Sequence, residues 1–293
     1  MNALWLWIVL SAAPAAPPPA IPARERWEAL TPQAREETLA SLGDQPLPQR
    51  LLEVSRRFLD TPYQVSPLGE GEGQLPDPDP LQRYDAVDCL TFVEETLALS
   101  LAGGAAEAAS LLREIRYHQQ ATYEDRNHLM EVQWLPNNAA KRFVQDVTRT
   151  YGGPDVVTAQ KVLTPGTWQS QSSRSLALPA PRQAVGRFRF PLLPIDKVMK
   201  HARAIPSGTL LLVVREDLPQ KATRITHLGF VVQKKKRTYL RHAARNGYGR
   251  VVDEDLETFL IRNSKYARWR VSGIRLFEVL PRDAPTVADS SPP

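Results

Sequence analysis

The chain has 293 residues, of which 42% are hydrophobic and 24% are charged. This length allows one large domain or two small ones, and the apolar residues suffice for a buried core. The net charge of +5 is modest and no basic stripe is interleaved with aromatic residues, which argues against nucleic acid as a partner. A mildly basic protein suits a polyanionic surface instead.

An uncharged apolar run over residues 3–13 begins the chain, and small residues and prolines follow it. The run is too short to span a bilayer easily and is typical of a secretory signal peptide, although a buried N-terminal helix is the alternative. We therefore expect residues 1–23 to be removed at an undefined position, and the protein to be exported to the periplasm or beyond without stable membrane insertion. Residues 281–293 are expected to form a flexible tail, which leaves residues 24–280 as a single domain.

Apolar residues recur at helical spacing in the first half of the chain. Thr31 is a suitable N-cap for the first helix, and Gly43 follows its end. Helices are expected within residues 24–60, over 88–102 and 105–120, and from a cap at Asn137 or Asn138 to Tyr151. The loop over residues 61–82 is rich in glycine, proline and aspartate, and its length is typical of a functional loop.

The second half favours strands, because short apolar and β-branched runs alternate with turn signals. Strands are expected at the end of the stretch 205–214 and over residues 226–233, 237–244, 250–252 and 271–280, with short helices near 195–204 and 254–263 and irregular structure over 164–194. Since helices come first and strands later, the sequence predicts an α+β fold with an antiparallel sheet.

Cys89 is the only cysteine, so it can form no internal disulfide in an exported protein. It lies in the first turn of the helix predicted over 88–102, with Asp85 or Asp88 as the N-cap. Free backbone N–H groups and the positive helix end stabilise a thiolate there, so we expect a lowered pKa for this thiol when a histidine assists. A cysteine on an apolar helix face is also typical of a core residue, and this signal alone does not decide between the two.

Two of the five histidines, His227 and His242, lie on adjacent predicted strands. A short even loop centred between Lys234 and Lys235 would place them directly opposite each other in an antiparallel hairpin, with Cβ atoms about 4.5–5.5 Å apart. A slip of one residue would separate them onto different faces. Together with Cys89 they supply a nucleophile, a base and a group that orients the base. The alternative is a chance pair of strand histidines.

The sequence contains no motif for a metal site or for a phosphate-binding loop. There is no H-E-x-x-H motif, and one cysteine with scattered histidines does not make a structural zinc site. No glycine-rich phosphate loop joins a strand to a helix. We therefore expect neither a metal nor a cofactor.

The Asp-Cys helix start, the His-x-Gly strand and the later His-Ala strand resemble the NlpC-type cell-wall cysteine peptidases, a papain-like superfamily. Within it, residues 45–280 are similar to the N-acetylmuramoyl-L-alanine amidase-like family. The motifs that carry this resemblance occur in the order DCLTFVEETLAL, DRNHLMEVQWLPNN, IPSGTLLLVV, THLGFVV, LRHAARNGYGRVV and GIRLFEV, after TPYQVSPLGEG. The chain departs from the family at Thr209, where aspartate is usual, and at Leu129, where an aromatic residue is usual.

The resemblance implies a papain-like fold, in which the helix that begins at Cys89 packs on an antiparallel sheet that carries the histidines. Cys89 would be the nucleophile and His227 the base and then the acid, while His242 would orient His227. Tyr63 and the Cys89 N–H would hold the oxyanion. The residues implied to line the substrate cleft are Asn127, His128, Trp134 and Asn137.

The implied activity is hydrolysis of the amide between the lactyl group of muramic acid and L-Ala, by a secreted, monomeric cell-wall hydrolase acting on peptidoglycan or muropeptides. The nearest alternative is an endopeptidase of the same fold that cuts between D-Glu and the diamino acid. A non-catalytic wall-binding module or an acyltransferase on lipids would also be compatible with these motifs, because a fold does not fix its chemistry.

Overall fold

The computed structural model describes residues 21–282. The signal peptide expected over residues 1–23 and the tail expected over residues 281–293 therefore lie almost wholly outside the described residues. Within residues 21–282, no helix combines the length and the apolar character needed to cross a membrane.

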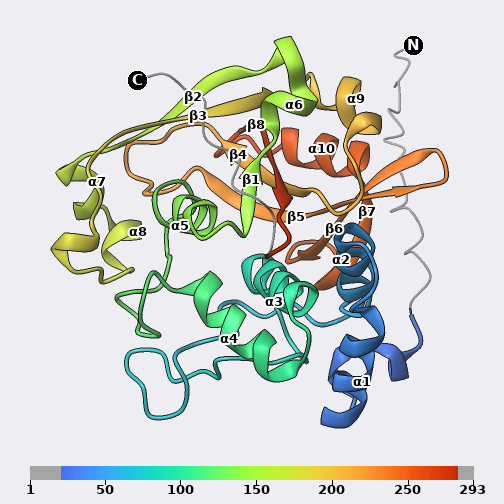
Figure 1. Ribbon diagram of the computed structural model, residues 1–293. Helices are drawn as coiled ribbons and strands as arrows, with labels where there is room; N and C mark the ends of the chain where they lie inside the picture. The colour runs from blue at the N-terminus through green and yellow to red at the C-terminus, as the bar shows by residue number, and fades with distance from the viewer. Residues whose placement is uncertain (1–20, 283–293) are drawn as a thin grey trace, which may run out of the picture.

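A sheet of eight strands, in which every pairing is antiparallel, forms the centre of the molecule (Figure 1). Its strand order is β2-β3-β8-β4-β5-β6-β7, and β1 pairs with β8. The strands are β1 Val144–Asp146, β2 Val157–Leu163, β3 Gly186–Pro194, β4 Leu210–Arg215, β5 Ile225–Lys234, β6 Arg237–Ala244, β7 Arg250–Asp255 and β8 Val271–Val279. The expected α+β class with an antiparallel sheet is confirmed.

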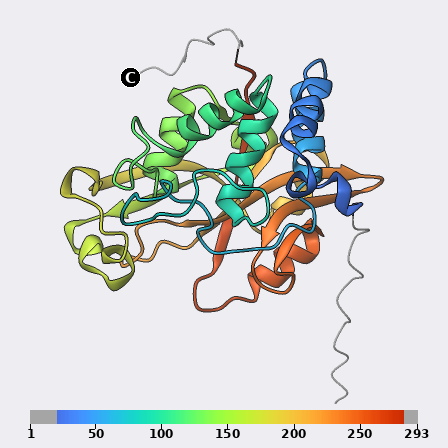
Figure 2. The same cartoon turned by 90° about the horizontal axis from the view of Figure 1, so that it is seen from below.

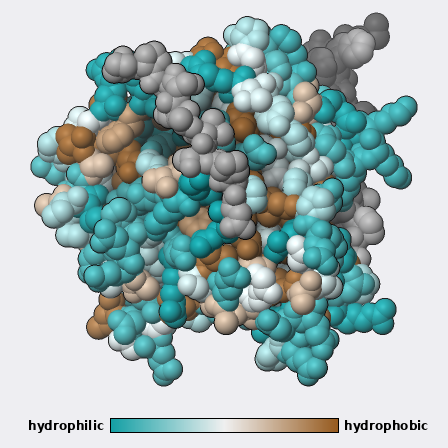
Figure 3. Space-filling model, in the orientation of Figure 1, coloured by the Kyte–Doolittle hydropathy of each residue, from teal (hydrophilic) through white to brown (hydrophobic). Residues whose placement is uncertain are grey.

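Helices cover both faces of this sheet. Those of the first half lie on one side, whereas α10 lies on the other (Figure 2). The helices are α1 Pro32–Leu42, α2 Leu47–Arg56, α3 Cys89–Leu101, α4 Ala105–Arg116, α5 Leu135–Ala140, α6 Thr148–Gly152, α7 Pro165–Gln169, α8 Gln171–Arg174, α9 Val198–His201 and α10 Leu256–Ser264. On the face seen in Figure 3, hydrophobic residues are scattered among a mostly hydrophilic surface, so the apolar side chains lie mainly inside.

Strand β4 shows how the core divides into two layers. Leu210 and Leu212 pack in the cluster that contains the residues of α2, α3 and α4, whereas Leu211 and Val213 pack in the cluster that contains Phe259 of α10. Successive side chains of a strand point to opposite faces, so a strand buried on both faces reads as a continuous apolar run. This explains why the sequence around residue 210 shows no polar alternation.

The helix that carries the cysteine begins with a capping box. The Asp88 carboxylate accepts from the backbone N–H groups of Leu90 and Thr91, and the Thr91 hydroxyl accepts from the Asp88 N–H. Almost every residue of α3 after the first turn is buried. The predicted helix is therefore confirmed, the structure selects Asp88 over Asp85 as its N-cap, and Cys89 is fixed at its first position.

Two expected elements are wrong. The helix from Asn137 or Asn138 to Tyr151 is interrupted, because Val144 leaves it to pair with Val279 of β8 and Arg142 has a positive φ of 61°. Asn138 is no cap; it is buried and donates to the Ile115 carbonyl. Tertiary strand pairing overrides the local helical pattern there.

The stretch expected to be irregular over residues 164–194 ends in strand β3, which forms a hairpin with β2. Pro191 and Pro194 concealed this strand, because proline weakens a strand prediction. Short helices α7 and α8 occupy the connection between the two strands.

Candidate active site

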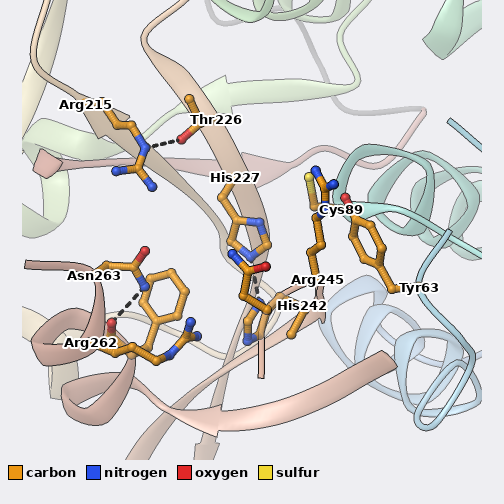
Figure 4. Close-up of a pocket in the computed structure, with 12 residues that line it drawn as sticks. Tyr63, Cys89, Arg215, Thr226, His227, His242, Arg245, Arg262 and Asn263 are labelled. Atoms are coloured by element: carbon orange, nitrogen blue, oxygen red, sulfur yellow. Dashed lines mark hydrogen bonds between the residues drawn. The ribbon is translucent and has the colours of Figure 1, made fainter. Parts of the chain in front are cut away.

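One cavity of about 220 Å³ brings together the residues proposed for chemistry. Its walls come from the start of α3, the ends of β4, β5 and β6, and α10 (Figure 4). The lining residues are Tyr63, Cys89, Arg215, Thr226, His227, His242, Ala244, Arg245, Asn246, Phe259, Arg262 and Asn263. The structure thus gathers the four residues Tyr63, Cys89, His227 and His242 at one place.

The β5–β6 hairpin sets the histidine pair, but with a different register from the one expected. The ladder runs from Lys234↔Arg237 to Phe230↔Arg241. One further step brings His242 opposite Gly229, so the prediction that His242 lies directly opposite His227 is wrong by two residues. Because side chains alternate with a period of two, this shift keeps both histidines on one face.

The two imidazoles meet diagonally. His227 Nε2 lies 2.6 Å from His242 Nδ1, and the rings are nearly perpendicular at an angle of 87°. A Cβ on Gly229 would lie 2.8 Å from the His242 Cβ, so only glycine leaves room for this side chain. Phe259 of α10 packs against both rings and holds them in place.

Glu254, which the sequence analysis did not identify, continues the chain of hydrogen bonds. His242 Nε2 lies 3.1 Å from Glu254 Oε2, and the Arg262 guanidinium also binds this carboxylate. Burial opposes the charged form of Glu254, but the hydrogen bonds from His242 and Arg262 outweigh it and hold its pKa below the ordinary value. The β6–β7 register pairs His242 with Val252. Glu254 lies two residues further along β7 and therefore on the same face as His242, so this register is the signal that could have identified it.

The charged Glu254 determines where the protons lie. A carboxylate only accepts, so His242 carries its proton on Nε2 and accepts at Nδ1. His227 then donates from Nε2 to His242 Nδ1, and its Nδ1 keeps a free lone pair. Figure 4 shows the side chains of Cys89 and His227 beside each other, with His242 beyond His227.

The pKa of Cys89 differs from expectation. Burial raises the pKa of this thiol and the Asp88 carboxylate adds to the rise, whereas backbone N–H groups, including that of Leu228, oppose it. Burial and the neighbouring charges of His242, Arg262 and Arg215 place the pKa of His227 well below its ordinary value. The expected lowering of the Cys89 pKa is therefore wrong, because burial outweighs the helix end and the neutral His227 supplies no positive charge. The resting pair is a neutral thiol and a neutral imidazole.

Tyr63 reaches the same cavity from the loop after α2. Its backbone N–H donates to the Gly249 carbonyl at 2.8 Å, and its backbone forms an isolated parallel β-bridge with Val87, just before α3. Burial raises the pKa of its hydroxyl, and the nearby Cys89 and Asp88 add to the rise. The hydroxyl therefore stays protonated and can donate a hydrogen bond.

A second cavity, of about 140 Å³, lies on the other side of the first turn of α3. Asn127 and His128 contribute to its wall, and burial lowers the pKa of His128 to about 4, so that its imidazole is neutral. The full set of lining residues is Ser66, Leu68, Asp88, Leu90, Thr91, Glu94, Arg116, Arg126, Asn127 and His128. Two of the four residues expected to line a substrate cleft therefore do line a cavity next to Cys89.

The other two, Trp134 and Asn137, line neither of these cavities. Trp134 is fully buried and donates from its indole to Glu94 at 2.9 Å. Asn137 donates to the Asn127 side chain. Both residues therefore support the wall of the second cavity from behind.

A neutral thiol next to a neutral imidazole is suited to nucleophilic attack on a carbonyl. Among residues 21–282, no three histidine, cysteine, aspartate or glutamate side chains are grouped as metal ligands would be.

The fold and the cavity define a class: an α+β protein whose cysteine-bearing helix faces histidines on an antiparallel sheet. The family model described as N-acetylmuramoyl-L-alanine amidase-like matches residues 53–266. The chain belongs to this family, as the sequence motifs predicted.

Solved structures with the same fold have low sequence identity to the chain. A protein of Legionella pneumophila is 22% identical with a TM-score of 0.74, and the alignment covers 85% of this chain and 94% of that one. An N-acetylmuramoyl-L-alanine amidase of Bacteroides uniformis is 22% identical with a TM-score of 0.65, covering 80% and 98%. No protein of curated function matches the chain.

Proposed function

We propose that the protein is an exported hydrolase that cleaves the amide bond between the muramic acid lactyl group and L-Ala in peptidoglycan, with Cys89 as nucleophile. One observation carries this proposal: the Cys89 thiol shares a cavity with an imidazole whose free nitrogen is set by the His242–Glu254 chain. Family membership supplies the choice of bond. The same arrangement supports a papain-like, NlpC-type catalytic domain that acts as a monomer.

In the first half of the reaction, His227 Nδ1 takes the thiol proton as the sulfur bonds to the amide carbon. The oxyanion accepts hydrogen bonds from Tyr63 and from the Cys89 N–H, which has no partner inside the helix because it lies in the first turn. The carbon–nitrogen bond then breaks, and His227 gives its proton to the leaving amine. The products are a thioester on Cys89 and a peptide with a free amino group.

In the second half, His227 removes a proton from water, which attacks the thioester carbon. The tetrahedral intermediate collapses, the lactyl acid leaves, and the proton returns to the sulfur. His242 supports each step in the same way, because it accepts from His227 Nε2 and disperses the positive charge toward Glu254.

The direction of substrate binding follows from the role of His227. Because His227 must reach the departing nitrogen, the leaving peptide lies on the β5 side of Cys89. The acyl group, which carries the sugar, then lies on the side of the second cavity, where Asn127 and His128 are placed. This assigns the sugar to a cavity walled by hydrogen-bonding side chains.

The test is hydrolysis of defined muropeptides by the purified protein, with Cys89→Ala as the matched inactive variant. Mass spectra are expected to show new free amino-terminal L-Ala with the wild type and none with the variant. A new amino terminus on the diamino acid would establish the endopeptidase instead. Wild-type hydrolysis by Cys89→Ala would reject the enzyme mechanism, and binding without hydrolysis by the wild type would establish a wall-binding module.

A further inference from the structure

Arg215, the last residue of β4, lines the catalytic cavity and has no carboxylate partner among the described residues. The other two arginines of the cavity differ from it. Arg262 pairs with Glu254, and Arg245 is exposed on the turn after β6. No aspartate or glutamate of the described chain lines the cavity, so its wall is positively charged.

The guanidinium of Arg215 is held rigidly. Its Nε donates to the Thr226 hydroxyl at 2.8 Å, and Nη1 donates to the Trp269 carbonyl. It also lies over the rings of Tyr266 and Trp269, at 5.1 and 5.8 Å from their centroids. Nη2 makes no hydrogen bond within the described residues, and Figure 4 shows the guanidinium turned toward the cavity.

A β-bulge places Arg215 close to the catalytic base. Val213 pairs with His227, but Val214 pairs with Ile225, so Thr226 is the extra residue of β5. The partner of Arg215 is thus the immediate neighbour of His227. A partly buried cation that lacks an opposite charge is unfavourable for folding, which makes a binding role the better explanation of its position.

We propose that Arg215 is a carboxylate-binding subsite for the leaving peptide, which makes the enzyme selective for acidic over amidated peptides. This rests on the proposed function, because it uses the position of the leaving amine next to His227. The planar guanidinium suits a carboxylate, and its free Nη2 offers the donor. The substrate class is therefore an N-acylated alanyl peptide with a free carboxylate on the residue that follows alanine.

The test compares two lactyl-alanyl peptides that differ only in this carboxylate, which is free in one and a carboxamide in the other. For the wild type, kcat/KM is expected to be about 10- to 100-fold higher for the free acid, the usual contribution of a charged hydrogen bond. Arg215→Gln is expected to bring this ratio close to one, mainly by raising KM for the acid. Arg215→Lys is expected to restore part of it.

Arg268→Gln is the matched control, because it removes the same charge from an exposed position in the neighbouring loop. It is expected to keep the wild-type ratio. Equal rates of the wild type on both peptides, or an unchanged ratio in Arg215→Gln, would overturn the proposal. A purely structural role of Arg215 would slow both substrates equally and leave the ratio intact.

A binding measurement separates this proposal from the proposed function. The acidic product peptide is titrated into Cys89→Ala by calorimetry, with and without the additional Arg215→Gln substitution. Weaker binding in the double variant supports the subsite whichever bond the wild type cuts. If the peptide binds both proteins equally, the subsite is rejected even when the wild type hydrolyses the proposed amide.

Discussion

Hydrogen bonds among three side chains, His227, His242 and Glu254, fix the protonation of the residues proposed for catalysis. The Glu254 carboxylate holds the His242 proton on Nε2, and His242 Nδ1 in turn accepts a hydrogen bond from His227 Nε2–H. His227 Nδ1, which keeps a free lone pair, can therefore act as a base toward the thiol in the same cavity without prior ionisation of that thiol. The tautomer of His227 is thus determined by the buried carboxylate of Glu254, which lies two hydrogen bonds away.

Glu254→Gln removes the charge that orients this chain. We expect kcat to fall about 10- to 100-fold with little change in KM, the range that applies when the partner orienting a metal-bound histidine is removed. Steady-state kinetics on a lactyl-alanyl amide would measure it. Glu257→Gln, an exposed change of the same kind on α10, should have no effect. An unchanged kcat in Glu254→Gln would mean that the carboxylate does not orient His242.

The lowered pKa of His227 predicts the acidic limb of the pH profile. Only neutral His227 can accept the thiol proton, and burial keeps it neutral to a pH well below 6.5. We expect kcat/KM to be half-maximal below pH 6.5 and to fall only as the pH drops through the lowered pKa. The measurement needs a substrate with no group that titrates between about pH 5 and 8. A half-maximal value at or above pH 6.5 would contradict the neutral pair.

At the scale of elements, the site depends on how the β5–β6 hairpin and its neighbours are joined. Arg241 of β6 binds Asp253 of β7 through two hydrogen bonds of 2.6 and 2.8 Å, and also donates to the Leu52 carbonyl of α2. A buried pair of this kind fixes three elements relative to one another. The strand that carries His242 is thereby held against the helices of the opposite layer.

Gly229→Ala tests the close approach of β5 and β6. The new Cβ would lie 2.4 Å from the Arg241 carbonyl oxygen and 2.8 Å from the His242 Cβ, so the strands must separate. We expect a loss of about 1–3 kcal/mol in the free energy of unfolding, as for other overpacked sites, together with lower kcat. Urea unfolding and kinetics would measure both.

Gly166→Ala is the matched control, because its Cβ would meet only the Thr164 hydroxyl, at 3.6 Å. It should change neither stability nor rate appreciably. If Gly229→Ala behaved in the same way, the strands would have room for a side chain and the hairpin would not constrain His242.

At the scale of the whole molecule, two buried carboxyl groups on α3 govern the dependence of stability on pH. Burial raises the pKa of Glu94 to about 7 and that of Glu95 to about 8. A raised pKa stabilises the folded state below the unfolded value of 4.5, and this contribution is lost as the pH rises through 7 and 8. The buried histidines, whose pKa values are lowered, act in the opposite direction but only below pH 6.5.

We therefore expect the free energy of unfolding to fall by about 3 kcal/mol between roughly pH 6.5 and 8.5. Urea unfolding at the two values would measure it. Glu95→Gln should reduce the fall by more than half, because Glu95 has the higher pKa and loses its proton over this whole interval. A flat profile in the wild type would show that both carboxyl groups are already ionised at neutral pH.

Sequence alone sufficed to predict the helix that carries Cys89 in its first turn, with Asp85 or Asp88 as the cap, because capping and helical spacing are local properties. It also determined that His227 and His242 share a face, since strand alternation survives a shift of two residues. The family followed from the ordered motifs. The helix cap and the shared face depend on residues close together in the chain, whereas the family depends on the order of motifs along it.

The rest of the site depends on how distant segments pack together. Glu254 and Arg215 join it through the pairing of β7 with β6 and through the bulge between β4 and β5. The Cys89 pKa changed direction because burial by distant segments outweighs the local helix end. Register, bulges and burial depend on contacts between distant parts of the chain, which no local pattern encodes. The sequence therefore identified the residues that we propose to react, whereas the packing of the sheet determined their protonation and the charge around them.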